Sequence, residues 1–331
     1  MRSLALALTV CLAALTQAAA QDSVTLKLGH FLPAPHPMAK YLQSWADGLK
    51  AETDGRITID VFPGAQLGPV PEYYDMTRRG IVDIGWILHG ATSNRFPLTG
   101  LIDIPFTVDS AVHGTRILND PQMRAVLDPE HRGVKVLYLF THQPAQIHTA
   151  GKAVATPADL EGLRIRFPSA TAKAFLDEMG AASIGLPPTQ IAENLQKNVI
   201  DGVVIDYGGA GIAFKLGGLV DHVTEFNGYV TSFGLIMNED AYASIPDDLK
   251  ATFDASITDV SDEIGALWDS LNAPGKAALE AGGATIVVPD EAAMAAFQAA
   301  ADTVGARLIE ERGEAAANAR ALMLELADTH R

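Results

Sequence analysis

The chain has 331 residues, and its 40 acidic and 24 basic side chains give a formal net charge of −16 at pH 7. An acidic surface of this kind disfavours nucleic acid and anionic membranes as partners. The only cysteine, Cys11, lies close to the N-terminus, so disulfides and Cys-ligated zinc are excluded from the rest of the chain. This length exceeds what one core usually organises, so we expect two lobes held together by core burial.

Residues 1–20 have the pattern of an export signal. Arg2 supplies a positive n-region, residues 4–15 form a short apolar core, and small residues precede a cleavage site near Ala20. A lipid anchor at Cys11 is the competing interpretation, but the apolar run continues past Cys11 and no small-residue lipobox precedes it. The segment is too short to span a bilayer comfortably, and no later segment reaches that length, so we expect a periplasmic protein without direct membrane insertion.

Alternating strands and helices follow in the first part of the mature chain. Residues 56–62 alternate between apolar and polar side chains as a half-buried strand does, and Gly55 ends the helix before it. The predicted strands are 24–30, 56–62, 81–88 and 134–140, and the predicted helices are 37–53, 71–79 and 113–127. This alternation indicates an α/β lobe with a parallel-rich sheet.

A second lobe is predicted to open near Gln146. Thr156 and Pro157 are typical of a helix start. The elements predicted after them are strands at 163–167 and 200–207, with helices at 169–179 and 189–197. A strand at 233–237 returns to the first lobe, and a long helix is predicted from 247 to about 281, interrupted only at Pro274-Gly275.

The predicted fold class is therefore α/β, a two-lobed periplasmic-binding-protein-like fold with hinge strands and a long helix that spans both lobes. We expect residues 21–144 and 232–272 in lobe 1, and residues 145–231 and 273–331, including an alanine-rich helical tail, in lobe 2. Such a hinge permits closure around a ligand in the cleft.

Arg166 is the most informative candidate for chemistry. It ends the predicted strand 163–167, and open α/β sheets bind ligands at the carboxyl ends of their strands. A guanidinium there offers a planar, permanently charged fork for a carboxylate. A solvated strand arginine is the alternative interpretation.

A series of motifs resembles one family along residues 24–250. The motifs, in order, are LKLGH (26–30), DGRITI (54–59), FPGAQLG (62–68), IPF (104–106), TPADLEGLRIR (156–166) and IDG (200–202). Together they are similar to the solute-binding proteins of tripartite ATP-independent periplasmic (TRAP) transporters. The resemblance implies a hinged two-lobed fold, delivery of a small organic acid to the membrane permease subunits of a TRAP transporter, and binding of the substrate carboxylate by Arg166.

Three further positions depart from the family pattern. Gln146 stands where sialic-acid-type members often have a second arginine, which suggests a ligand with one carboxylate. Asp206 and Tyr207 follow the strand at 200–207. Asp206 either accepts from a ligand hydroxyl or ammonium or pairs with a nearby base, and Tyr207 is either a pocket wall or a core residue.

Other candidates for ligand contact lie at predicted strand ends or on the cleft faces of strands. For each, packing in the core is the competing interpretation. They are His30, Phe31, Trp86, His89, His148 and Phe233.

The sequence contains no motif of a catalytic site. It has no Gly-x-Ser-x-Gly elbow, no His-Glu-x-x-His helix and no Walker-type loop, and its nine histidines lack metal-ligand spacing. We therefore expect a binding protein, not an enzyme, with no cofactor and no metal, that captures a small organic anion, preferably a monocarboxylate. The alternatives are a sensory or binding module for a zwitterionic or amine ligand, and a hydrolase whose catalytic groups converge from distant segments.

Overall fold

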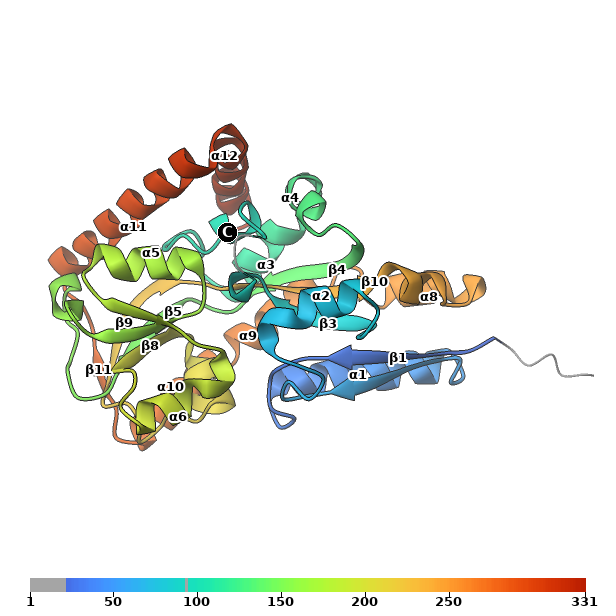
Figure 1. The fold of residues 1–331 in the computed structure, drawn as a ribbon, viewed down its shortest axis with the longest axis horizontal. Coiled ribbons are helices and arrows are strands. Elements are labelled where there is room, and N and C mark those ends of the chain that lie inside the picture. The colour runs from blue at the N-terminus through green and yellow to red at the C-terminus, as the bar shows by residue number, and fades with distance from the viewer. Residues whose placement is uncertain (1–21, 93–94) are drawn as a thin grey trace, which may run out of the picture.

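The computed structural model describes residues 22–92 and 95–331, so the predicted signal peptide (residues 1–20) lies outside the described residues. Two β-sheets lie side by side, each with its own helices, as Figure 1 shows. The predicted two-lobed α/β architecture is confirmed.

The first lobe is built on a five-stranded sheet with the order β2-β1-β3-β10-β4. Its β1 pairs in parallel with β2 and β3, whereas β10 is antiparallel to β3 and β4. The strands are β1 (Val24–Gly29), β2 (Ile57–Phe62), β3 (Ile84–Leu88), β4 (Val134–Thr141) and β10 (Ser232–Asn238). Their helices are α1 (Pro37–Glu52), α2 (Tyr73–Arg78), α3 (Ala111–Asn119), α4 (Pro121–Leu127), α7 (Glu239–Ala243), α8 (Lys250–Ala255) and α9 (Ser261–Asp269).

The second lobe is built on a six-stranded sheet with the order β11-β9-β5-β8-β6-β7. Here β6 is parallel to β7 and β8, and β5 is antiparallel to β8 and β9. The strands are β5 (Ala145–Thr149), β6 (Arg164–Phe167), β7 (Ala182–Gly185), β8 (Gly202–Ile205), β9 (His222–Tyr229) and β11 (Thr285–Val287). Their helices are α5 (Ala170–Glu178), α6 (Ile191–Gln196) and α10 (Asn272–Ala281), and an irregular helical segment covers Gly208–Ala213.

Two adjacent connections carry the chain between the sheets. Residues 142–144 join β4 to β5, and residues 230–231 join β9 to β10. They are linked to each other, because the Thr231 amide donates to His142 Nε2 at 3.1 Å. A third crossing at residues 270–271 joins α9 to α10. The predicted hinge strands are therefore present.

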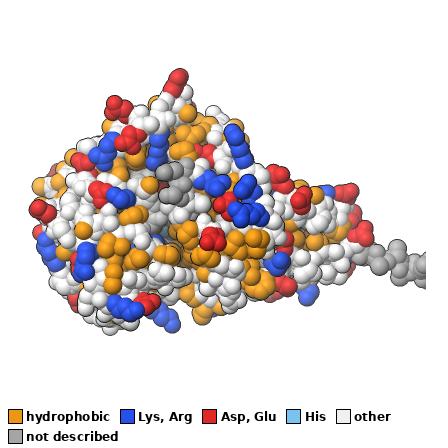
Figure 2. Space-filling view, viewed as in Figure 1, with side chains coloured by type: hydrophobic (Ala, Val, Ile, Leu, Met, Phe, Trp, Pro, Cys, Tyr) orange, Lys and Arg blue, Asp and Glu red, His pale blue; other side chains and the backbone are white. Residues whose placement is uncertain are grey.

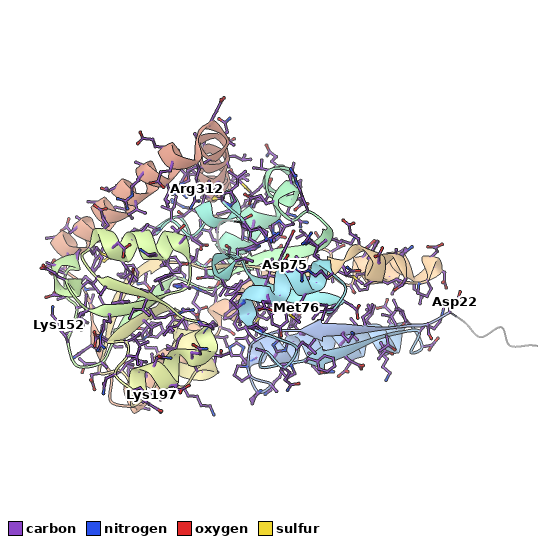
Figure 3. The ribbon with its side chains drawn as sticks, in the orientation of Figure 1. Asp22, Asp75, Met76, Lys152, Lys197 and Arg312 are labelled. Carbon is purple, nitrogen blue, oxygen red and sulfur yellow. The ribbon has the colours of Figure 1, made fainter. Side chains whose placement is uncertain are left out.

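Helices α11 (Glu291–Arg312) and α12 (Glu314–Thr329) form a bent arm over both lobes (Figure 1). Near its start, α11 inserts Phe297 into the core of the second lobe. Farther along, Leu308 packs in a cluster with Leu101, and α12 adds Met323 to the same cluster. Arg312, labelled in Figure 3, donates from Nη1 to the Pro97 carbonyl at 2.6 Å. A long helix that spans both lobes is thus present, but it is α11 and not the segment predicted from 247 to 281.

The position of this arm changes one of the predicted lobe boundaries. Residues 273–331 are predicted to belong to lobe 2, but α12 packs on α3 and α4, which cover the first sheet. We therefore propose that α11 and α12 are shared between the two lobes, and we keep the other boundaries as proposals.

Some predicted elements differ from the structure. The long helix predicted from 247 to 281 is wrong, because α8, α9 and α10 are separate helices, and Asp259 between α8 and α9 has a φ of 58° that no α-helix accommodates. The helix predicted at 113–127 is divided at Asp120-Pro121, where Asp120 caps α4. Strands β7, β9 and β11 were not predicted.

Candidate functional site

A cavity lies between the lobes where the hinge connections pass. Its empty space amounts to about 440 Å³ when the solvent at its open mouth is included, and its walls come from both sheets, from α9 and from both hinge connections. The lining residues are Phe31, Leu32, Leu88, His142, Arg166, Pro168, Pro188, Val204, Ile205, Asp206, Gly209, Phe214, Thr231, Phe233 and Trp268.

Arg166, on the second-lobe side, is the only arginine or lysine among the residues that line this cavity. It lies on β6 next to β8, and its side chain is held by a hydrogen bond from Nε to the Leu186 carbonyl at 2.9 Å. Among the described residues, its two Nη atoms donate no hydrogen bond, and no carboxylate forms an ion pair with it. Burial lowers the pKa of Arg166 to about 10, so the group stays charged at neutral pH. A buried cation without a counter-charge is costly, and an anionic ligand removes that cost.

Arg164 on the same strand is a useful contrast. It makes a two-pronged ion pair with Asp201, with Nε to Oδ2 at 2.9 Å and Nη2 to Oδ1 at 2.5 Å. Its side chain is 42% exposed, whereas Arg166 is 2% exposed as a residue. The two arginines of this motif therefore differ in whether they can bind a ligand. Arg164 is already paired at the surface, whereas Arg166 faces the cavity.

Asp206 lines the same cavity and has a structural partner. Its Oδ1 accepts from the Gly209 amide at 2.8 Å, at the start of the helical segment Gly208–Ala213. It forms no ion pair with Arg166. The glycines after it serve packing, because a Cβ on Gly211 would lie 2.8 Å from the Gly275 Cα of α10. They let α10 approach closely.

Aromatic rings form the first-lobe side of the cavity. Phe233 of β10 stacks on Trp268 of α9, with ring centroids 5.9 Å apart and an interplanar angle of 2°. Phe31, just after β1, lies 6.2 Å from Phe233 between centroids. This wall offers flat apolar surfaces opposite a single cation.

Four of the ten predicted site residues line the cavity: Arg166, Asp206, Phe31 and Phe233. His30 and Trp86 are buried behind the aromatic wall, where their rings lie 6.1 Å apart.

Gln146 and Tyr207 have their polar atoms engaged elsewhere. The Gln146 amide donates to Asn227 Oδ1 at 2.6 Å and accepts from the Asn227 amide at 3.1 Å, which fixes an irregularity in the β5–β9 pairing. Tyr207 donates to Glu225 at 2.9 Å. Neither residue lines the cavity, so we leave both out of the proposed site.

His148 and His89 are also placed away from the cavity. His148 Nε2 is 2.9 Å from the Ile205 carbonyl. His89 pairs with His131, with 3.0 Å between their Nε2 atoms, and faces a separate groove beside α5. Burial lowers the pKa of His148 to about 4 and that of His89 well below its usual value, so both rings are neutral at pH 7. We leave them out of the proposed site as well.

Several lining residues were not predicted. Trp268 lies in the region expected to be one long helix, and nothing in that pattern shows which helix face meets the cleft. His142 and Thr231 occupy the short hinge connections, where periodicity carries no signal. Pro168 directly follows the predicted strand that carries Arg166, so the rule that ligands bind at strand ends was sufficient to find it. Pro188 follows β7, a strand that was not predicted.

The described residues contain no group of three or more His, Cys, Asp or Glu side chains arranged to hold a metal ion. Within residues 22–92 and 95–331, none of the helices has the length and apolar character needed to cross a bilayer.

Comparison with known proteins identifies the family. The model of the bacterial extracellular solute-binding proteins, family 7 (DctP), matches residues 28–312. A TRAP solute-binding protein from a marine metagenome, specific for aromatic acid ligands and crystallised with metahydroxyphenylacetate, is 31% identical with a TM-score of 0.88, over 93% of this chain and 99% of that chain. One from Rhodoferax ferrireducens, crystallised with copurified benzoate, is 28% identical with the same TM-score, over 93% of this chain and 98% of that chain.

A sequence relative supports the same assignment. A solute-binding protein of Roseobacter denitrificans is 29% identical over 321 residues, which cover 92% of this chain and 94% of the relative. The resemblance inferred from the motifs is confirmed, and with it the expectation of a binding protein instead of an enzyme. The chain belongs to the DctP family of TRAP solute-binding proteins.

Proposed function

We propose that this protein captures an aromatic monocarboxylate in the periplasm and delivers it to the membrane subunits of a TRAP transporter. Relatives at 27–31% identity support the ligand class, since they were crystallised with metahydroxyphenylacetate, 3-hydroxybenzoate, benzoate or mandelate. The export signal at residues 1–20, with cleavage near Ala20, belongs to the same proposal.

One observation carries the proposal: Arg166 is the only lysine or arginine among the lining residues, and its Nη atoms have no described protein partner. A single fork matches a single carboxylate. Phe31, Phe233 and Trp268 then provide surfaces against which an aromatic ring packs. A dicarboxylate would bring a second charge to an apolar wall.

Binding is coupled to the position of the lobes. Arg166 belongs to the second lobe, and the aromatic wall belongs to the first. A ligand that contacts both therefore has higher affinity for the closed arrangement and shifts the hinge equilibrium toward it. The permease then receives a closed, ligand-loaded protein.

Calorimetry with benzoate and phenylacetate tests the proposal. Arg166→Ala should weaken binding of either acid by at least about tenfold, equivalent to roughly 1.4 kcal/mol. Arg164→Ala is the matched control, because it removes a neighbouring arginine of the same strand that is already paired with Asp201. Binding unchanged by Arg166→Ala, or lost equally in both variants, contradicts the assignment.

A zwitterionic or amine ligand that uses Asp206 is the alternative, favoured by the position of this carboxylate on the cavity wall. The amide of Gly209 already occupies one of its oxygens. Phenylalanine and benzylamine, titrated beside phenylacetate, separate the two proposals, since only the alternative predicts that an ammonium group strengthens binding.

A further inference from the structure

The ligand cavity is lined by one cationic and one anionic side chain, and both belong to the second lobe. Arg166 of β6 is the only lysine or arginine among the lining residues, and Asp206, directly after β8, is the only carboxylate. The two residues are 2% and 3% exposed. Among the described residues no ion pair joins them. Because the two charges do not neutralise each other in a direct contact, both act on a molecule that enters the cavity.

The pairing of β6 with β8 places these two groups apart. Arg166 lies opposite Val203 in the parallel pairing, and Asp206 follows three residues later. At about 3.3 Å per residue, Asp206 is displaced from Arg166 by roughly 10 Å along the strand direction. The two charges therefore belong to different parts of the cavity wall, and a carboxylate bound by Arg166 does not have to lie beside Asp206.

The side chain of Asp206 is held in place by the glycine-rich segment after it. Its Oδ1 accepts from the Gly209 amide at 2.8 Å. A Cβ added to Gly209 would lie 2.8 Å from Asp206 Oδ2, and one added to Gly208 would lie 3.0 Å from Oδ1. The backbone thus approaches both carboxylate oxygens closely, which limits the space into which this side chain could turn away from a ligand.

The rest of the cavity wall offers no lysine or arginine for a second ligand anion. Apart from His142 and Thr231, the remaining lining residues are apolar or glycine. Both ring nitrogens of His142 are engaged within the hinge, since Nε2 accepts from the Thr231 amide at 3.1 Å and Nδ1 lies 2.5 Å from the Gln143 carbonyl oxygen. Charges in such a wall interact more strongly than in water, because little solvent screens them.

We propose that Asp206 is a specificity-determining residue, whose negative charge rejects aromatic acids that carry a second carboxylate and accepts those with a neutral substituent. The inference rests on the proposed function and adds a mechanism of selection to it. Arg166 binds the carboxylate that every such ligand has, and Asp206 repels the additional one. A repulsive element directed against the unwanted ligand is an effective source of specificity.

The test compares, by calorimetry at neutral pH, benzoates that carry a second group at the meta or the para position. The second group is either a carboxylate, as in isophthalate and terephthalate, or the corresponding carboxamide. A carboxamide has nearly the size and shape of a carboxylate but no charge. We expect the wild-type protein to bind the carboxamide at least about tenfold more tightly than the diacid at one or both positions.

Asp206→Asn removes the charge and keeps an oxygen that can accept from the Gly209 amide. In this variant the ratio between carboxamide and diacid should fall at least about fivefold. Removal of the second ligand charge from water remains costly in both proteins, so the change in the ratio measures the effect of Asp206 alone. Asp221→Asn is the matched control, because Asp221 also accepts from a backbone amide, that of Gly151 at 2.7 Å, but does not line the cavity.

The outcomes separate the inference from the proposed function. If benzoate binds but the wild-type protein does not prefer the carboxamide, the role of Asp206 is refuted and the proposed function stands. The same conclusion follows if the ratio falls less than expected in Asp206→Asn or falls equally in Asp221→Asn. If no aromatic acid binds the wild-type protein, the proposed function itself is refuted.

Discussion

Gly90 provides a sharp test of lobe closure, because at this residue the first lobe touches the second directly. A Cβ added to Gly90 would lie 2.7 Å from the Pro168 carbonyl oxygen and 2.8 Å from the Ser169 Cα, and it would also overlap the Ser169 Cβ. Ser169 is tied to Tyr229 at 2.6 Å, and Tyr229 donates to the first-lobe Asp103 at 3.2 Å. Pro168 and Ser169 directly follow the strand that carries Arg166.

Gly90→Ala should therefore penalise the closed arrangement without a direct contact to the ligand. Its φ is outside the left-handed region, so alanine is tolerated by the backbone itself. Overpacking of this kind typically costs about 1–3 kcal/mol. If the penalty falls on the closed arrangement alone, the Kd for the carboxylate ligand rises roughly 5- to 150-fold.

The assay is calorimetry with benzoate, combined with thermal unfolding of the ligand-free protein. We expect weaker binding together with a Tm close to that of the wild type, since an open arrangement relieves the overlap. Gly100→Ala is the control, because a Cβ there meets no atom within 4 Å. Unchanged affinity in Gly90→Ala, or an equal loss in Gly100→Ala, would refute the closure argument.

Two further predictions concern stability. Burial lowers the pKa of four histidines, His30, His36, His131 and His148, to about 4. Between pH 4 and 6.5 the unfolded chain therefore binds more protons than the folded chain, so the stability of the folded chain falls as the pH decreases through that range. Asp103, whose pKa burial raises to about 7, opposes this trend, because its folded form gains a proton first. The combined effect of the four histidines is larger than that of Asp103. Urea unfolding should therefore give a free energy of unfolding at least about 2 kcal/mol lower at pH 5 than at pH 7. Equal or greater stability at pH 5 contradicts the reasoning. Separately, Phe297→Ala should destabilise the protein by about 3–5 kcal/mol in the same assay. The Phe297 ring is fully buried and packs α11 against Phe226, with 5.5 Å between the ring centroids. A loss below about 1 kcal/mol would show that α11 is not anchored there.

The sequence predicts those strands and site residues whose positions depend on a local pattern of residues. The strand that carries Arg166 is predicted at 163–167 and lies at Arg164–Phe167 in the structure, and the motif resemblance identifies the family. Arg166, Phe31 and Phe233 reach the cavity because each lies at or near a strand end that faces the cleft.

The remaining site residues depend on partners that are distant in sequence. Gln146 is engaged by Asn227 of β9, a strand that was not predicted because Asn227-Gly228 has the pattern of a turn. Trp268 reaches the cavity only because the chain breaks between α8, α9 and α10 turn α9 toward the hinge, and His142 is placed by its bond to Thr231. Such tertiary contacts have no periodic signature.

Gly313, between α11 and α12, adopts φ 76° and ψ −163°, a backbone region that is essentially reserved for glycine. Gly313 lies at the bend between the two helices of the arm. Phe297 of α11 packs in the core of the second lobe, and Met323 of α12 packs in the cluster that contains Leu101. Because the arm packs on both halves, any opening of the cleft must either change the angle between α11 and α12 at Gly313 or separate one of these helices from its cluster.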